Sequence, residues 1–272
     1  MSTQDIVQKL WNLCNILRDD GITYHQYVTE LTYILFLKMI NETGTEEKLI
    51  KAVKEMIKKL DDEQKSQFKE LGEYSWTYLT SLEGLELKKY YNKLLTQLGS
   101  APLNEISRIY VKAVSSIDEP RNLKKIITEI DKLDWYDAKS EGLGDLYEGL
   151  LQKNADEKKS GAGQYFTPRV LIDVMTELIA PKLGEKCFDP ACGTFGFMIA
   201  AYRVATKGKT FYELTDTEVK QIEDSFGGVE LVPDAHRLAL MNAYLHNVPA
   251  NIECMDSLSS NAKKFKEFEA LP

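Results

Sequence analysis

The spacing of hydrophobic residues separates a helical first half of the chain from a mixed second half. Between residues 6 and 17 apolar side chains recur at i, i+4, i+7, i+8 and i+11, which is typical of one face of a helix. Neither strand alternation nor an internal repeat occurs before residue 134. Helices are predicted around 6–17 and 27–37, from Thr45 onward after a stop at Gly44, and over 86–98, 103–114 and 120–133.

The pattern changes after the segment Asp134–Ser140, which is the best candidate for a domain boundary. An apolar stripe from Leu143 to Leu151 predicts one more helix, and a polar stretch at 154–163 predicts a loop. From Gly163 on, helices and short strands alternate, which indicates a parallel, doubly wound α/β sheet. The predicted strands are 186–188, 226–231 and 251–255, and the predicted helices include 196–205 and 233–246. The domains are therefore placed at 1–137 and 138–272.

Two further segments of the second half have local signals. Thr167 followed by Pro168 is typical of a helix N-cap with proline at the first helical position. The apolar face of that helix is predicted to contain Val170, Leu171, Val174 and Leu178. The acidic, polar stretch 206–224 is interpreted as an inserted loop or short helix.

Composition and charge restrict the class of protein. The chain has 43% hydrophobic and 28% charged residues, as in ordinary globular proteins, and no apolar run long enough for a membrane span. Its first residues do not resemble a signal peptide, and its four scattered cysteines favour reduced thiols in a cytoplasm. The net charge of −8 argues against a protein that binds DNA by its whole surface, but permits a DNA enzyme whose partner supplies most DNA contacts.

The residues with the clearest chemistry lie between the first predicted strand and its helix. The run Asp-Pro-Ala-Cys-Gly-Thr-Phe-Gly-Phe at 189–197 contains small residues that let a ligand approach the backbone. In a parallel sheet the ligand crevice lies beyond the carboxyl ends of the strands. Glu230 ends the next strand, where a carboxylate can accept hydrogen bonds from both hydroxyls of a ribose. Taken singly, the run is also compatible with an ordinary strand-to-helix turn, and Glu230 with a solvated carboxylate.

Three elements in the same order resemble the N6-adenine DNA methyltransferases, and in particular the modification subunits of type I restriction–modification systems. They are Gly-Ala-Gly-Gln-Tyr-Phe-Thr-Pro-Arg at 161–169, Asp-Pro-Ala-Cys-Gly-Thr at 189–194, and Gly-Val-Glu-Leu-Val-Pro at 228–233 with Arg-Leu-Ala-Leu-Met-Asn at 237–242. The helical first half is similar to that family's N-terminal domain. The resemblance therefore spans essentially the whole chain and implies an incomplete Rossmann-like methyltransferase domain after a helical domain.

The resemblance implies a site for S-adenosylmethionine. Asp189 would hold the ammonium end of the cofactor, and Glu230 would bind its ribose. Asp256 would lie near the adenine amino group, although Asp-Ser is equally typical of a helix N-cap. The segment against the methionine end would be Gln164, Tyr165, Phe166, Thr167, Pro168 and Arg169, and the loop residues leaving room for the cofactor would be Gly193, Thr194 and Gly196. Phe195 departs from the glycine or alanine common in the family, so its side chain must point away from the cofactor or narrow the pocket.

The resemblance also implies adenine N6 methylation of DNA, within a complex of two modification subunits and one specificity subunit, sometimes with a restriction subunit. The family's catalytic Asn-Pro-Pro-Phe motif, or Asp-Pro-Pro-Tyr, occurs nowhere in the 272 residues. We therefore expect a truncated chain that contains no catalytic residue and is inactive by itself. No metal site is expected, because the three histidines lack partners at ligand spacing.

The sequence bears differently on two other classes of function. A nicotinamide or flavin oxidoreductase would have Gly-x-Gly-x-x-Gly after the first strand, which the run at 189–197 does not match. A non-catalytic interaction module with a methyltransferase-like fold stays open as the alternative, because the catalytic motif is absent. Cys192 as a nucleophile is disfavoured against a small buried residue, since no suitably placed base is visible.

Overall fold

The computed structural model describes residues 3–14, 17, 21–22, 24–103, 105–133, 135, 143–158 and 167–260. The chain forms two compact units, Met1–Leu150 and Leu151–Pro272. The division between them falls inside helix α12 (Leu143–Lys158), downstream of the domain boundary placed at 137/138 from the sequence.

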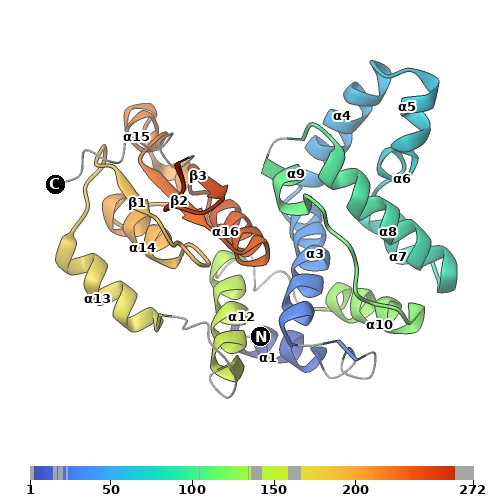
Figure 1. The fold of residues 1–272 in the computed structure, drawn as a ribbon, viewed down its shortest axis with the longest axis horizontal. Helices are drawn as coiled ribbons and strands as arrows, with labels where there is room; N and C mark the ends of the chain where they lie inside the picture. Colours follow the sequence, from blue (N-terminus) through green and yellow to red (C-terminus); the bar gives the residue numbers. More distant parts are fainter. Residues whose placement is uncertain are drawn as a thin grey trace. The chain divides into compact units, whose positions relative to one another are not determined.

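The described secondary structure of the first unit consists of helices and no strand, as the hydrophobic spacing predicts (Figure 1). Helix α3 supplies much of its core, because almost every side chain between Tyr27 and Ile40 is buried. The described helices before α12 are α1 (Thr3–Asn12), α3 (Tyr24–Glu42), α4 (Thr45–Lys58), α5 (Asp62–Gln67), α6 (Lys69–Gly72), α7 (Trp76–Ser81), α8 (Gly84–Ser100), α9 (Glu105–Tyr110) and α10 (Pro120–Asp131).

Helix boundaries in this unit agree with the sequence where a specific residue sets them. Gly44 adopts a left-handed φ of 71°, which ends the preceding helical segment, and α4 begins at Thr45 as predicted. The helix predicted over 103–114 is too long, because α9 ends at Tyr110 and Lys112 takes a positive φ of 54°. The short helices α5, α6 and α7 were not predicted, since four to six residues are too few to show a period.

The second unit contains a three-stranded parallel sheet in the order β1-β2-β3 (Figure 1). Each predicted strand is present within one residue, and the register pairs Asp189 with Gly228 and Glu230 with Cys254. A helix follows β1 and β2, as the alternation predicts. The elements are α13 (Arg169–Ile179), β1 (Cys187–Asp189), α14 (Gly196–Ala205), η1 (Phe211–Glu213), α15 (Asp216–Ile222), β2 (Phe226–Glu230), α16 (Pro233–Leu245) and β3 (Ala250–Cys254). The stretch 206–224 is confirmed as short helical turns.

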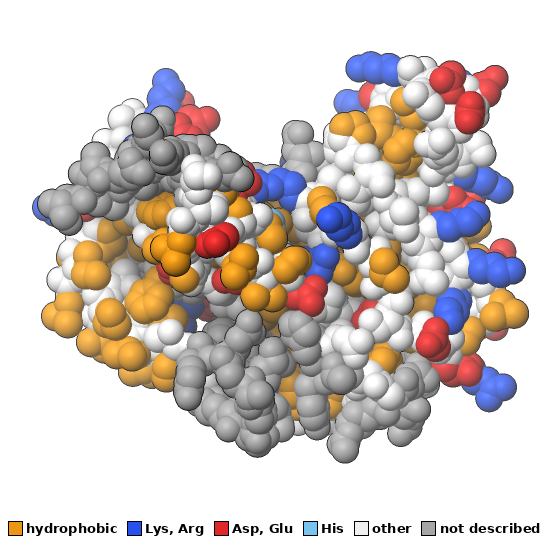
Figure 2. Space-filling view, in the orientation of Figure 1, with side chains coloured by type: hydrophobic (Ala, Val, Ile, Leu, Met, Phe, Trp, Pro, Cys, Tyr) orange, Lys and Arg blue, Asp and Glu red, His pale blue; other side chains and the backbone are white. Residues whose placement is uncertain are grey.

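Helix α13 differs from its prediction in two respects. Pro168, with an extended ψ of 135°, is itself the N-cap residue, so the prediction of Thr167 as N-cap and Pro168 at the first helical position is wrong by one residue. The predicted apolar face is present but exposed, while the helix buries Ile172 and Thr176 instead. Figure 2 shows the apolar side chains gathered over this helix. The exposed residues are Val170, Leu171, Val174, Met175, Leu178 and Ile179.

Within the described part of the chain, no helix combines the length and the apolar character needed to cross a membrane.

Candidate cofactor site

Two carboxylates meet at the carboxyl edge of the sheet. Asp189 is the last residue of β1, and Glu230 is the last residue of β2. Since the two strands are parallel neighbours, their ends bring both side chains to the same edge, which is where ligands bind in open parallel sheets. Both residues are half-buried, and the loop 190–195 runs beside them to the start of α14.

Hydrogen bonds hold that loop in one conformation. The Ala191 N–H donates to Asp189 Oδ1 at 3.0 Å, and the Cys192 N–H donates to the Val229 carbonyl at 2.9 Å. The Gly193 N–H donates to Glu230 Oε2 at 2.9 Å. The loop therefore takes its shape from both strand ends, and Glu230 is part of its support.

Glu230 keeps hydrogen-bonding capacity for a ligand. Its second oxygen, Oε1, accepts from the Val232 N–H at 2.8 Å. Each oxygen of an ionised carboxylate can accept about two hydrogen bonds, so each has one acceptor position left. Two vicinal hydroxyls, such as those of a ribose, match that arrangement.

The electrostatics of the carboxylate pair favour a positively charged ligand. Burial raises the pKa of Asp189, and the negative charge of Glu230 raises it further, against the opposing effect of the Ala191 N–H. Among the described residues, no basic side chain forms an ion pair with either carboxylate. A cation at this edge would relieve the repulsion between Asp189 and Glu230.

Two loop residues adopt left-handed backbone conformations, but the space beside one of them is open while the side chain of the other is buried. Gly193 has a φ of 53°, and an added Cβ would meet no atom within 4 Å, so the loop is open beside it. Phe195 has a φ of 70° and is fully buried. Its ring Cε2 lies 3.1 Å from where a Cβ on Gly228 would stand, so the ring packs against the backbone of β2. Phe195 thus points away from the open space and supports the loop from within.

The remaining loop residues have mixed surroundings. A Cβ added to Gly196 would lie 3.2 Å from Ile172 Cδ1 and 3.7 Å from Arg169 Nη1, so the space beside Gly196 is taken by α13. Cys192 is buried, and burial together with the charges of Asp189 and Glu230 raises the pKa of its thiol. A buried neutral thiol agrees with the interpretation of Cys192 as a small packing residue.

The start of α13 lies next to the start of α14. Arg169 Nη1 lies 3.7 Å from where a Cβ on Gly196, the first residue of α14, would stand, and Arg169 Nε lies 3.6 Å from Asp173 Oδ1. Thr167 is half-buried and Pro168 is exposed. Gln164, Tyr165 and Phe166, predicted to contact the cofactor, lie outside the described residues.

Asp256 follows β3 and is exposed. Its Oδ1 accepts from the Leu258 N–H at 2.9 Å, which closes a tight turn. The preceding residue, Met255, donates its N–H to the Glu230 carbonyl at 3.0 Å, so the backbone at Asp256 is tied to the end of β2. The side chain thus has the local bonding typical of a capping aspartate, with its second oxygen still available.

One residue at the site lies at the end of the run 237–242 that resembles the family, but the sequence indicated no role for it in the site. Asn242 on α16 is 1% exposed, and its Nδ2 donates to the Thr194 carbonyl at 2.9 Å across 48 residues. The sequence contained no local signal for this contact, because a single polar residue in an otherwise buried helix does not indicate its partner.

Two family models match the chain. The N-6 DNA methylase model matches residues 138–271, and the HsdM N-terminal domain model matches residues 6–130. The StySJI type I restriction enzyme methylase subunit of Salmonella typhimurium is 41% identical over 259 residues, which cover 93% of this chain and 45% of that protein. The chain thus spans less than half the length of this curated relative.

Solved structures have a similar fold. The type I restriction–modification methyltransferase subunit of Streptococcus thermophilus matches with a TM-score of 0.62 and 19% identity, over 96% of this chain and 60% of that one. A chain solved in work on complex assembly and conformational transition of the type I R-M system matches with a TM-score of 0.66 and 25% identity, over 94% of this chain and 51% of that one. The helical region followed by a small parallel sheet is therefore a partial Rossmann-like methyltransferase fold, as predicted.

Proposed function

Because the chain belongs to the family of type I restriction enzyme methylase subunits, we propose that it forms the cofactor-binding part of a subunit that transfers a methyl group from S-adenosylmethionine to adenine N6 in DNA. We place the helical domain at 1–137 and the first part of the methyltransferase domain at 138–272. The observation that supports this most directly is the pair Asp189 and Glu230 beside the open space at Gly193.

The carboxylate pair fits S-adenosylmethionine better than a dinucleotide. The cofactor has an ammonium group, a sulfonium group and a ribose diol, and the two carboxylates offer acceptors for the first and last of these. The diphosphate of a dinucleotide would instead meet two negative charges at this edge. In our proposal Glu230 binds the ribose, Asp189 the ammonium end and Asp256 the adenine amino group. The methionine end would lie against Gln164–Arg169, with Gly193 and Thr194 lining the approach; the space beside Gly196, expected from the family to admit the cofactor, is filled by α13.

The described residues would bind and orient rather than react. S-adenosylmethionine supplies an electrophilic methyl group on a positively charged sulfur, so the protein mainly needs to fix the donor relative to the base. Glu230, held by the Gly193 and Val232 N–H groups, would fix the ribose end. The target adenine would be turned out of the duplex to reach the donor. We expect no methyl transfer by the 272 residues alone.

The proposed partners are DNA, a specificity subunit, a second modification subunit and, in some complexes, a restriction subunit. The net charge of −8 supports a division of labour in which another subunit makes most of the phosphate contacts. The solved relative whose title concerns assembly of the type I R-M system supports a multisubunit setting. We place the complex in the cytoplasm, consistent with four free cysteines.

Isothermal titration calorimetry of the 272-residue chain tests this function. We expect S-adenosylmethionine to bind and NAD not to bind. Glu230→Ala should weaken S-adenosylmethionine binding about 100-fold or more, because two charge-assisted hydrogen bonds are lost. The exposed Glu223→Ala is the matched control and should leave binding unchanged. Equal binding by Glu230→Ala and the parent chain would refute the ribose assignment, and a parent chain that binds NAD alone would refute the proposed function.

A further inference from the structure

The loop between β1 and α14 is supported from two directions. Cys192 and Gly193 are tied to the end of β2, through the Val229 carbonyl and the Glu230 carboxylate. Thr194 is tied instead to α16, because its carbonyl accepts the Asn242 Nδ2–H at 2.9 Å. The peptide group before Gly193 and the peptide group after Thr194 are thus fixed by different elements of the unit.

Asn242 is a costly residue for this position. It is 1% exposed and lies among the buried side chains of α16, including Leu238 and Met241. Its Oδ1 is buried and accepts no hydrogen bond within the described part of the chain. A buried carbonyl oxygen without a donor lowers the stability of a fold, so an apolar side chain of similar volume would stabilise α16 more. Stability alone therefore does not explain an asparagine here.

Asn242 is bonded to the loop next to its strained residue, Phe195. Thr194 stands between Gly193 and Phe195, and both neighbours have left-handed φ values, of 53° and 70°. A non-glycine residue such as Phe195 adopts this conformation only when its surroundings impose it. Fixing the Thr194 carbonyl sets the orientation of the Thr194–Phe195 peptide, which helps to keep the loop in the conformation that leaves the space beside Gly193 open.

We propose that Asn242 is a positioning residue for the cofactor site. Its amide anchors the Thr194 carbonyl and keeps the loop 190–195 in the conformation that can bind the ligand. The proposal rests on the function proposed above, because it names S-adenosylmethionine as the ligand. Asn242 itself touches the loop and not the ligand. Its contribution is to preorganise the loop, which lowers the entropy lost on binding.

The test compares affinity with stability. Asn242→Leu removes the anchor and the unpaired oxygen together, so S-adenosylmethionine affinity should fall about tenfold in calorimetry while the melting temperature stays equal or rises. A purely structural hydrogen bond would lower the melting temperature and leave affinity unchanged. Asn242→Ala, which cannot overfill the site, should show the same loss of affinity.

Two matched controls in the same unit separate the effects. Tyr202→Phe removes another buried oxygen without a partner and should raise the melting temperature without changing affinity. Thr206→Val removes a buried side-chain hydrogen bond to the Tyr202 carbonyl, 2.9 Å long, and should lower the melting temperature without changing affinity.

Hydrogen exchange without ligand gives a readout independent of the cofactor. The N–H groups of residues 193–195 should exchange at least severalfold faster in Asn242→Leu than in the parent chain. Equal affinity and equal loop exchange in the two proteins would overturn the proposal. If the parent chain binds no S-adenosylmethionine, the proposed function fails, and loop exchange alone then decides whether Asn242 is the anchor.

Discussion

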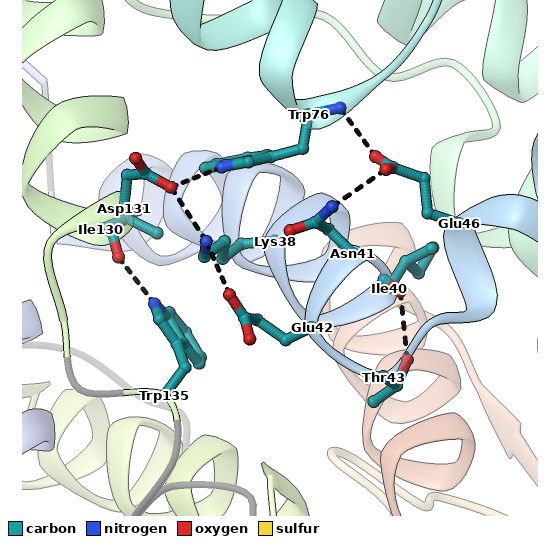
Figure 3. Close-up of polar contacts among 10 residues, drawn as sticks. All are labelled: Lys38, Ile40, Asn41, Glu42, Thr43, Glu46, Trp76, Ile130, Asp131 and Trp135. Carbon is teal, nitrogen blue, oxygen red and sulfur yellow. Dashed lines mark hydrogen bonds and ion pairs between the residues drawn. The ribbon is translucent and has the colours of Figure 1, made fainter.

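Each unit of the chain contains a group of partly buried carboxylates, and the two groups are balanced in opposite ways. In the helical unit, Glu42 and Asp131 surround the buried ammonium group of Lys38 (Figure 3). In the α/β unit, Asp189 and Glu230 lie together without an ion pair to any described basic side chain. The difference separates carboxylates that stabilise the fold from the two carboxylates that we propose for ligand binding.

The Lys38 cluster is a compensated set of charges. Lys38 Nζ lies 2.8 Å from Glu42 Oε1, 2.9 Å from Asp131 Oδ1 and 5.2 Å from the centre of the Trp76 ring. The indole N–H of Trp76 donates to the same Asp131 oxygen at 2.7 Å, and its backbone N–H donates to Glu46 at 2.7 Å. Figure 3 shows how these contacts join α3, α4, α7 and α10.

The pKa shifts of the two groups have opposite signs. Burial alone would raise the pKa of Asp131, but the hydrogen bonds from Lys38 and Trp76 and the Lys38 charge outweigh it and lower that pKa. For Asp189, burial and the charge of Glu230 raise the pKa. The fold therefore gains from ionising Asp131 and loses from ionising Asp189, which supports the proposal that Asp189 binds a cationic group.

The largest effect that would sharpen this comparison comes from removing the central cation. Lys38→Met leaves two acids beside a buried apolar side chain, and we expect a loss of about 2–4 kcal/mol in the free energy of unfolding. Urea denaturation of the variant and the parent chain measures it. Lys58→Met, which breaks an exposed pair with Glu55, is the matched control and should cost less than about 0.5 kcal/mol. A Lys38 variant as stable as its control would show that the cluster is not a stabilising one.

A smaller effect should follow from neutralising Asp131. Since its folded pKa is lowered, its contribution is complete above the ordinary value of 3.8 and is lost as the pH falls below it. Asp131→Asn should cost about 1 kcal/mol at pH 7, a figure reduced for the 44% exposure of the side chain. Thermal unfolding from pH 7 to pH 3 should show the variant and the parent chain converging at the acid end. A constant difference across that range would contradict the charge-based origin.

The positions of the strands were predictable because local signals in the sequence mark them. The first strand runs into Asp189-Pro190, and the second begins near paired glycines, so the observed bounds differ from the predictions by one residue at most. The position of the loop 189–196 could likewise be predicted from neighbouring residues, since it lies between a predicted strand and a predicted helix. How the loop is held was not predictable, since Glu230 and Asn242 reach it from 37 and 48 residues away.

Burial was the other property that hydrophobic spacing could not supply. The period of α13 indicated an apolar face correctly, but a period does not show whether another element covers that face, and Val170 and Leu178 are exposed. The reverse holds for Lys38, a buried charge whose partner Asp131 is 93 residues away. The role of every cofactor residue, from Gln164 to Asp256, stays a prediction until binding is measured.

The smallest expected change in stability gives the most direct contrast between the two units, because neutralising Asp189 should have the opposite effect to neutralising Asp131. Asp189→Asn keeps the acceptor for the Ala191 N–H but removes the charge that burial and Glu230 disfavour. Because the folded pKa of Asp189 is raised, the stability linked to its protonated form is present below pH 3.8 and is lost as the pH rises through the folded pKa. At pH 7 the variant should therefore melt about 1–3 °C above the parent chain, and the gain should vanish near pH 3.8.

In the same protein, S-adenosylmethionine affinity should fall about tenfold, because a charged partner for the ammonium group is lost. The exposed Asp224→Asn serves as control and should change neither quantity. A fall in the melting temperature, as in Asp131→Asn, would place Asp189 among the stabilising acids and remove the contrast between the two units.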